Sequence, residues 1–161
     1  MQQTILRILV SALALAGLAD ALYFTLAYYG RVRKARWVPE VLCAREDSSC
    51  VTVVKTPYGR VFGVPNSLLG IVYYAGTIAG AAEGWGFGVN WEFHWAGRAI
   101  PWGLGVMTLA AAATVLLGIY LIYALRRKLH VHCPLCYTAH AINAALLVLL
   151  VMLAWSLRRL P

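Results

Sequence analysis

Long uncharged apolar stretches constrain the fold of this chain more than any other feature. Two of them, residues 100–125 and 133–157, are long enough to cross a hydrocarbon core of about 30 Å as helices of roughly 20 residues. A third, residues 8–30, is interrupted only by Asp20, and a shorter fourth covers residues 67–82. With 61% hydrophobic and 12% charged residues, the composition excludes a soluble domain of this size.

These stretches predict an all-α integral membrane protein, a bundle of four transmembrane helices with a cysteine-bearing loop between the first and second helices. The spans are expected at about residues 6–29, 65–85, 100–125 and 133–157. Because four helices use most of the 161 residues, we expect residues 1–161 to form a single domain. The first span is longer than the apolar region of a signal peptide, about 7–15 residues, so we expect it to be retained.

Four spans place both termini on one side of the membrane and the four cysteines together on the other. The opposite connection, residues 83–99, is rich in aromatic residues, which are typical of the membrane interface. We therefore expect these side chains to act as interfacial anchors: Trp85, Phe87, Trp91, Phe93 and Trp95.

A CxxC motif, Cys133-Pro134-Leu135-Cys136, opens the last apolar stretch. Proline suits the first helical position, which places Cys133 near the N-cap and Cys136 in the first turn. Unpaired backbone N–H groups at that helix end favour a thiolate. A basic cluster just upstream is expected to act in the same direction: Arg126, Arg127, Lys128, His130 and His132. The motif therefore predicts a redox-active dithiol at a water-facing helix mouth.

A polar stripe continues along the same helix. At 100° per residue, Cys133, Cys136, His140 and Asn143 fall within an arc of about 80°. The stripe could bind the carbonyl oxygens of a quinone beside Cys136, or His140 and Asn143 could form hydrogen bonds across the bundle.

Asp20, within the first span, also has two possible roles, since a charged carboxylate within a span costs about 3 kcal/mol unless it is paired or protonated. It could bind a proton or a ligand in the bundle interior, or it could form a buried hydrogen bond to a neighbouring helix.

Five segments carry a resemblance to the vitamin K epoxide reductase (VKOR) family over nearly the whole chain. They are Cys43 with Cys50, TPYGRVFG at 56–63, PNSLLG at 65–70, CPLC at 133–136 and AIN at 141–143. The cysteine order is specific, because the CxxC comes first in the analogous DsbB family and last here. Two features depart from the family: the loop pair encloses six residues where seven are usual, and His140 replaces the tyrosine of vertebrate members.

The resemblance implies a membrane thiol–disulfide oxidoreductase that forms disulfide bonds. A reduced thioredoxin-fold partner would attack the Cys43–Cys50 disulfide at Cys43, and Cys50 would then attack Cys133. Cys136 would pass the electrons to a quinone of the ubiquinone or menaquinone type. Since the chain ends soon after the last span, without the fused thioredoxin-like domain of many bacterial relatives, the partner is expected to be a separate protein.

Four residues are expected to contact the quinone. Asn66 matches the family asparagine that bonds a quinone carbonyl, and Thr56 matches a loop hydroxyl residue near the dithiol; His140 and Asn143 come from the stripe. Taken alone, Asn66 could equally be the N-cap of the second span, and Thr56 an ordinary turn residue. We expect a monomer surrounded by membrane lipid, with no metal and no nucleic-acid partner.

Other chemistries use the same cysteines. Run in reverse, the four thiols would reduce a quinone or its epoxide with thioredoxin electrons, as in the vertebrate members. All four could instead close a Cys₄ zinc site. A disulfide-stapled scaffold without redox activity is a third reading.

The balance of basic residues predicts an orientation. Ten Lys and Arg residues lie on the cysteine side and four on the other. Basic residues in short loops stay cytoplasmic, so the cysteines are expected to face the cytoplasm, the inverse of the family's usual exterior orientation. Disulfide formation in the cytosol fits a hyperthermophile. The basic loop could instead attract an acidic partner or anionic lipid.

Overall fold

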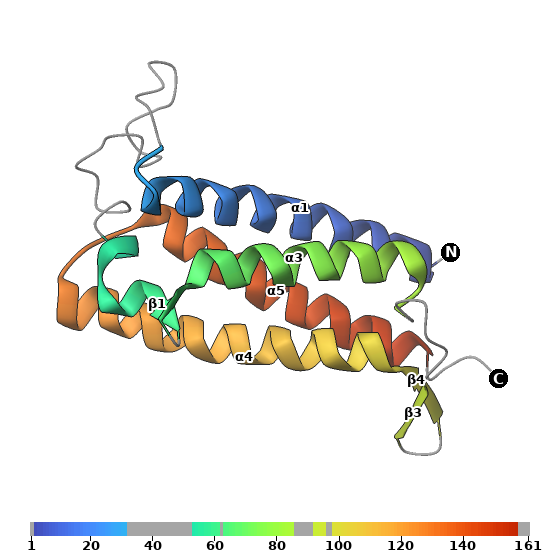
Figure 1. Cartoon of the computed structure of the whole chain (residues 1–161). Helices are drawn as coiled ribbons and strands as arrows, with labels where there is room; N and C mark the ends of the chain where they lie inside the picture. Colours follow the sequence, from blue (N-terminus) through green and yellow to red (C-terminus); the bar gives the residue numbers. More distant parts are fainter. Residues whose placement is uncertain (1, 32–52, 62, 86–91, 96–97, 158–161) are drawn as a thin grey trace.

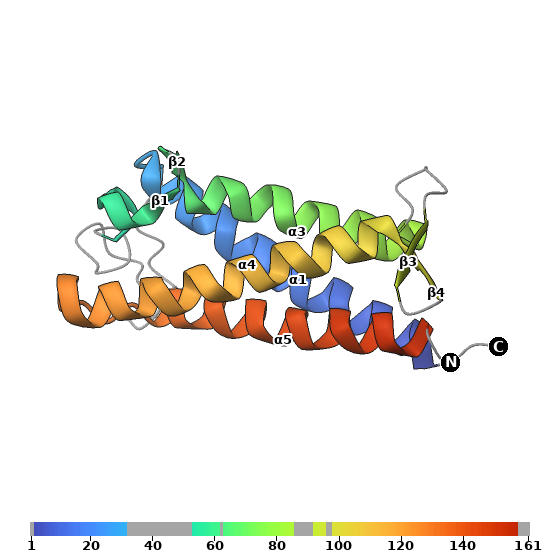
Figure 2. The same cartoon turned by 90° about the horizontal axis from the view of Figure 1, so that it is seen from below.

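Four long helices lie side by side in alternating directions and make up most of the molecule (Figures 1 and 2). The computed structural model describes residues 2–31, 53–61, 63–85, 92–95 and 98–157. The helices are α1 (Gln2–Tyr28), α3 (Asn66–Glu83), α4 (Trp102–Ala124) and α5 (Pro134–Leu157). Helix α4 continues into one π-helical turn, η3 (Leu125–Leu129), and a 3₁₀ turn, η2 (Pro57–Gly59), precedes α3.

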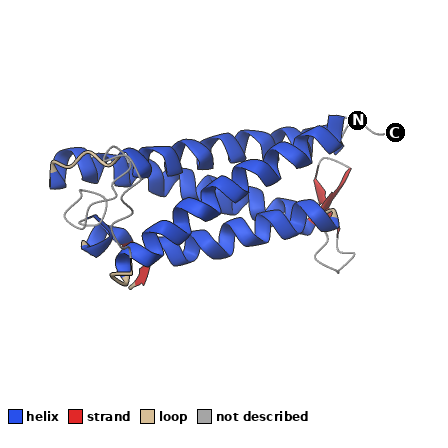
Figure 3. Cartoon of the chain, turned by 90° about the horizontal axis from the view of Figure 1, so that it is seen from above, coloured by secondary structure: helices blue, strands red, loops and turns tan. Residues whose placement is uncertain are grey.

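Two short antiparallel ladders close the ends of the bundle. Strand β1 (Arg60–Val61) pairs with β2 (Val64–Pro65) just before α3, with Arg60 opposite Pro65. Strand β3 (Glu92–Trp95) pairs with β4 (Arg98–Pro101) just before α4. Figure 3 shows the two ladders at opposite ends of the helices.

The alternating directions sort the connections between the two ends of the bundle. The start of α1, the end of α5 and the β3–β4 ladder share one end, and residues 53–65, η3 and the start of α5 share the other (Figure 1). Cys43 and Cys50 lie outside the described residues. The segments that flank their loop, ending at Arg31 and resuming at Val53, lie at the same end as Cys133.

Three helical stretches in the described ranges are long and apolar enough to cross a membrane: Gln2–Tyr28, Trp102–Leu129 and Pro134–Leu157. Their outer faces are apolar as well; Leu109 of α4, for example, is 73% exposed. The expected span at 65–85 forms α3, whose 18 residues rise about 27 Å, slightly less than a hydrocarbon core. The expected apolar helices of membrane-spanning length are thus confirmed for three stretches, and the fourth span stays a prediction.

The bundle core is made by apolar side chains from all four helices, including the fully buried Val10, Leu104 and Leu146. Trp85 joins this core with 1% of its surface exposed, so the expectation of an interfacial anchor is wrong for this residue. The reason is local. Gly84 ends α3 in the left-handed conformation, with φ 79°, and the Trp85 N–H donates to the Gly80 carbonyl. The chain reverses at this turn, and the Trp85 indole packs against the bundle core.

Of the other four expected anchors, two lie in strand β3 and two lie outside the described residues. Phe87 and Trp91 lie outside the described residues, and Phe93 and Trp95 are described only as part of strand β3.

Candidate active site

The dithiol lies at the start of α5. This helix begins at Pro134, the residue expected in the first helical position, so Cys136 lies in the first turn. The Cys133 sulfur accepts a hydrogen bond from the Cys136 backbone N–H at 3.3 Å, and the Cys133 carbonyl accepts one from Tyr137 at 3.2 Å. The Cys133 side chain therefore satisfies one of the backbone donors that a helix start leaves unpaired.

Hydrogen bonds make Cys133 the more thiolate-like sulfur of the pair. The Cys136 thiol donates to it, and this bond lowers the pKa of Cys133 below its ordinary value, with help from backbone N–H groups. Burial opposes the shift, since Cys133 has no exposed surface. The upstream basic residues Arg126, Arg127 and Lys128 are exposed on η3, where solvent screens their charge. Hydrogen bonds, and not the charge of the basic cluster, thus account for the lowered pKa of Cys133.

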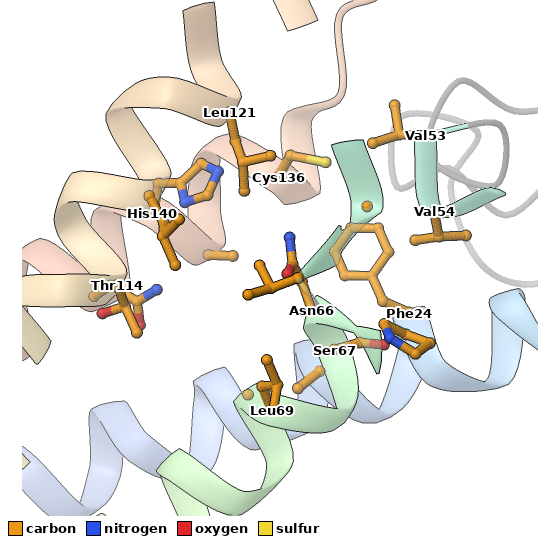
Figure 4. A pocket seen from close by; sticks show the side chains of 18 of the residues that line it. Phe24, Val53, Val54, Asn66, Ser67, Leu69, Thr114, Leu121, Cys136 and His140 are labelled. Carbon is orange, nitrogen blue, oxygen red and sulfur yellow. The ribbon is translucent and has the colours of Figure 1, made fainter. Parts of the chain in front are cut away.

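A cavity of about 250 Å³ lies between the four helices directly below this dithiol. Its volume far exceeds the 10–15 Å³ or so that one water molecule needs, and its walls are mostly apolar, as in sites for organic ligands. Cys136 lines the cavity and Cys133 does not. In Figure 4, Cys136 and His140 from α5 and Asn66 from the start of α3 surround the same space.

Several polar atoms on the cavity wall have no hydrogen-bond partner within the described part of the chain. They are Asp20 Oδ1, Ser67 Oγ and His140 Nδ1. Buried polar atoms are normally paired, because an unpaired one loses its hydrogen bonds to water. These atoms belong to residues that line one apolar cavity, which favours a ligand that carries hydrogen-bonding groups of its own.

Tyr74 and Asn143 form a hydrogen bond across the bundle, in which the Tyr74 hydroxyl donates to Asn143 Oδ1 at 2.7 Å. Both residues line the cavity, and the bond fixes the amide so that its nitrogen can donate to a ligand. A Cβ atom at Gly17 of α1 would collide with the Tyr74 ring, so this glycine makes the arrangement possible. Cross-bundle bonding and cavity lining, which the sequence left as alternatives, are therefore combined at Asn143.

His140 depends on a second glycine. A Cβ atom at Gly118 of α4 would lie 2.7 Å from His140 Nδ1. The absence of a side chain at Gly118 lets α4 and α5 pack closely while the imidazole remains on the cavity wall.

A family model supplies the decisive comparison: the model described as the vitamin K epoxide reductase family matches residues 8–151. The chain belongs to the VKOR family. It is therefore a membrane oxidoreductase of the family that connects disulfide chemistry with quinones. A comparison with curated proteins found no match.

Three of the four expected quinone contacts line the cavity, namely Asn66, His140 and Asn143. Asn66 is the first residue of α3 and not its N-cap, a position held by Pro65, and its amide donates to the Tyr58 carbonyl at 3.4 Å. The Thr56 hydroxyl donates to the Val53 carbonyl at 2.7 Å and does not line the cavity. A role for Thr56 at the quinone stays a prediction.

Tyr73 and Tyr74 were not predicted as site residues, because a tyrosine pair in an apolar helix also suits a membrane interface. Within the described ranges, no group of three or more His, Cys, Asp or Glu side chains could hold a metal ion. The Cys₄ zinc alternative requires Cys43 and Cys50, which lie outside those ranges, and it stays untested.

Proposed function

We propose that this chain oxidises a separate thioredoxin-fold protein and passes the electrons to a quinone dissolved in the membrane. One observation carries the proposal: of the two CPLC cysteines, Cys136 lines a ligand-sized cavity within the bundle and Cys133 lies outside it. Both cysteines share a buried cluster with Val53 and Val54, which follow the Cys43/Cys50 loop. A dithiol placed between a loop and a cavity is suited to relay electrons from one to the other.

Thiol–disulfide exchange would load the relay. A partner thiolate attacks the Cys43–Cys50 disulfide at Cys43, and the released Cys50 thiolate attacks the Cys133–Cys136 disulfide at Cys133. Cys136 leaves as a thiolate. The second thiolate of the partner then displaces Cys43 from the mixed disulfide, which leaves the partner disulfide-bonded. The freed Cys43 attacks Cys50, which restores the loop disulfide and leaves both electrons on the CPLC pair. The chain length supports this order, because Cys50 precedes Val53 by three residues, a reach of about 11 Å.

The cavity residues fit a quinone. The amides of Asn66 and Asn143 and the imidazole of His140 offer hydrogen bonds to carbonyl oxygens, and the apolar walls suit a ring with an isoprenoid tail. A quinone bound there would accept two electrons and two protons. The reduction potential of the acceptor also favours a quinone. Strongly oxidising thioredoxin-fold proteins have reduction potentials of about −120 mV, far above those of glutathione pools, so a glutathione couple would reduce such a partner. Only an acceptor of higher potential can oxidise it.

We infer that α3 crosses the bilayer as a fourth span and that the cysteine end faces the cytoplasm. Val72 of α3 is 72% exposed, as expected for contact with lipid. The positive-inside rule supports the orientation, because many basic residues are exposed at the cysteine end. They are Arg31, Lys55, Arg60, Arg126, Arg127 and Lys128.

Labelling in intact cells tests this orientation. A variant that retains only Cys43 is expected to resist a membrane-impermeant thiol reagent until the cells are permeabilised. A cysteine-free chain carrying Glu83→Cys, at the exposed far end of α3, provides the matched control and should react from outside. Rapid labelling of Cys43 in intact cells, with protection at position 83, would show the family's usual orientation.

Purified protein given a reduced thioredoxin-fold donor and a quinone tests the function itself. We expect quinol to form and donor disulfide to accumulate in equal amounts. One equivalent of tightly bound zinc that is lost when any cysteine is replaced would favour the Cys₄ site and contradict the relay.

Replacement of Gly118 tests the contribution of His140. In Gly118→Ala the new methyl group must displace the imidazole, and we expect at least about a tenfold loss of kcat/KM for the quinone. Gly105→Ala in the same helix is the control, because a Cβ atom there meets no heavy atom within 4 Å. Equal kinetics in the two variants would show that the position of His140 is unimportant for quinone reduction.

A further inference from the structure

Asp20 is a carboxyl group on the cavity wall for which the cysteine relay has no use. It belongs to α1 and lines the same cavity as Cys136 and His140. Its Oδ1 is buried and has no hydrogen-bond partner within the described residues. A carboxylate held there would be costly, about 3 kcal/mol on insertion scales, so the neutral acid is the form that this site favours.

We propose that Asp20 donates a proton to the quinone while the CPLC dithiol is oxidised. This inference rests on the proposed function, and it assigns a catalytic residue beyond the cysteines and the carbonyl contacts.

Proton balance requires such a donor. Oxidation of Cys133 and Cys136 to a disulfide releases two electrons, and conversion of a quinone to a quinol consumes two electrons and two protons. A reduced pair that consists of a Cys133 thiolate and a Cys136 thiol holds only one of those protons. The neutral Asp20 carboxyl supplies the second and becomes a carboxylate, which later regains a proton from the aqueous side.

The electrostatics agree with this order of events. The pKa of Cys133 is lowered chiefly by the hydrogen bond from Cys136, whereas a charge on Asp20 acts to raise it. A Cys133 thiolate and a neutral Asp20 therefore favour each other before the reaction. Once Cys133 has entered the disulfide, its negative charge is gone and the carboxylate that Asp20 becomes is tolerated more easily.

The other titratable groups on the cavity wall are weaker candidates. Tyr74 already donates its hydroxyl hydrogen to Asn143, and tyrosine is a poor acid, with an ordinary pKa near 10. The Tyr73 hydroxyl has the same weakness. A neutral His140 is better suited to a hydrogen bond with a carbonyl than to giving up its only N–H proton.

Single-turnover oxidation of pre-reduced protein by excess quinone tests the proposal. We expect Asp20→Asn to slow quinol formation by about a hundredfold, in the usual range for a general acid. Exchange between the partner and the loop cysteines should be unaffected, and Asp20→Glu should retain most of the rate. Glu83→Gln, which makes the same carboxyl-to-amide change at the exposed end of α3, should behave as wild type.

Infrared difference spectroscopy gives a readout independent of turnover. The wild-type spectrum should contain a protonated-carboxyl band that Glu83→Gln retains, Asp20→Asn lacks and quinone binding shifts. Oxidation of Asp20→Asn at the wild-type rate would overturn the proposal. So would a wild-type carboxyl band that quinone leaves unmoved, a result that does not require the variant to fold. Failure of wild-type protein to reduce quinone would instead contradict the proposed function itself.

Discussion

Replacement of Cys136 with alanine is expected to abolish quinone reduction with every thiol donor, by at least about a thousandfold. Among the described cysteines it is the one that lines the cavity, and without it Cys133 has no partner with which to form the CPLC disulfide. The Cys133 thiol that remains can still attack the Cys43–Cys50 disulfide at Cys50 and release Cys43 as a thiolate, so a Cys50–Cys133 disulfide should accumulate. Peptide mapping by mass spectrometry would detect that bond beside the loss of quinol formation.

Thr138→Ala is the matched control for this variant. Thr138 is exposed on the next turn of α5, where its hydroxyl donates to the Pro134 carbonyl and does not line the cavity. Its replacement should leave turnover unchanged. Quinone reduction that survives in Cys136→Ala would mean that the cysteines only staple the fold.

Replacement of Cys43 or Cys50 is expected to have an equally large effect, but with one class of donor only. Turnover with a thioredoxin-fold donor should be lost, because exchange with that protein begins at the loop pair. A small dithiol should still support slow turnover by reducing the Cys133–Cys136 disulfide directly. The rate should be modest, since Cys133 has no exposed surface and Cys136 only 9%.

The ratio of the two activities is the measurement that separates the steps. In Cys43→Ala and Cys50→Ala the ratio of protein-driven to dithiol-driven turnover should fall sharply, and in Cys136→Ala both rates should vanish together. Loss of the two activities to the same extent in Cys43→Ala would contradict a separate role for the loop pair.

Local patterns were enough to predict the helix that carries the chemistry. Pro134 marks its start. Simple helical periodicity predicted one face for Cys133, Cys136, His140 and Asn143; the last three line the cavity and Cys133 does not. The three helices long and apolar enough to cross a membrane follow from uncharged length in the same way. These features depend on residues that are close together in the chain, so they can be recognised from a single sequence.

Contacts between helices were not predictable in this way. The bond from Tyr74 to Asn143 joins residues 69 positions apart, and the spaces at Gly17 and Gly118 exist only because another helix places a ring there. Asp20 could be recognised as costly, but its place in the cavity depends on how α1 packs against its neighbours. Trp85 was misread because composition alone does not reveal that Gly84 turns the chain back toward the core.

The most direct test of a relay ending at Cys136 is the reaction of fully reduced protein with one equivalent of quinone in the absence of any donor. We predict formation of one equivalent of quinol. The same reaction in a variant that lacks Cys43 and Cys50 should also yield quinol, and peptide mapping of that variant should identify a disulfide between Cys133 and Cys136. Quinone that remains oxidised while both thiols of the CPLC motif stay reduced would contradict the relay.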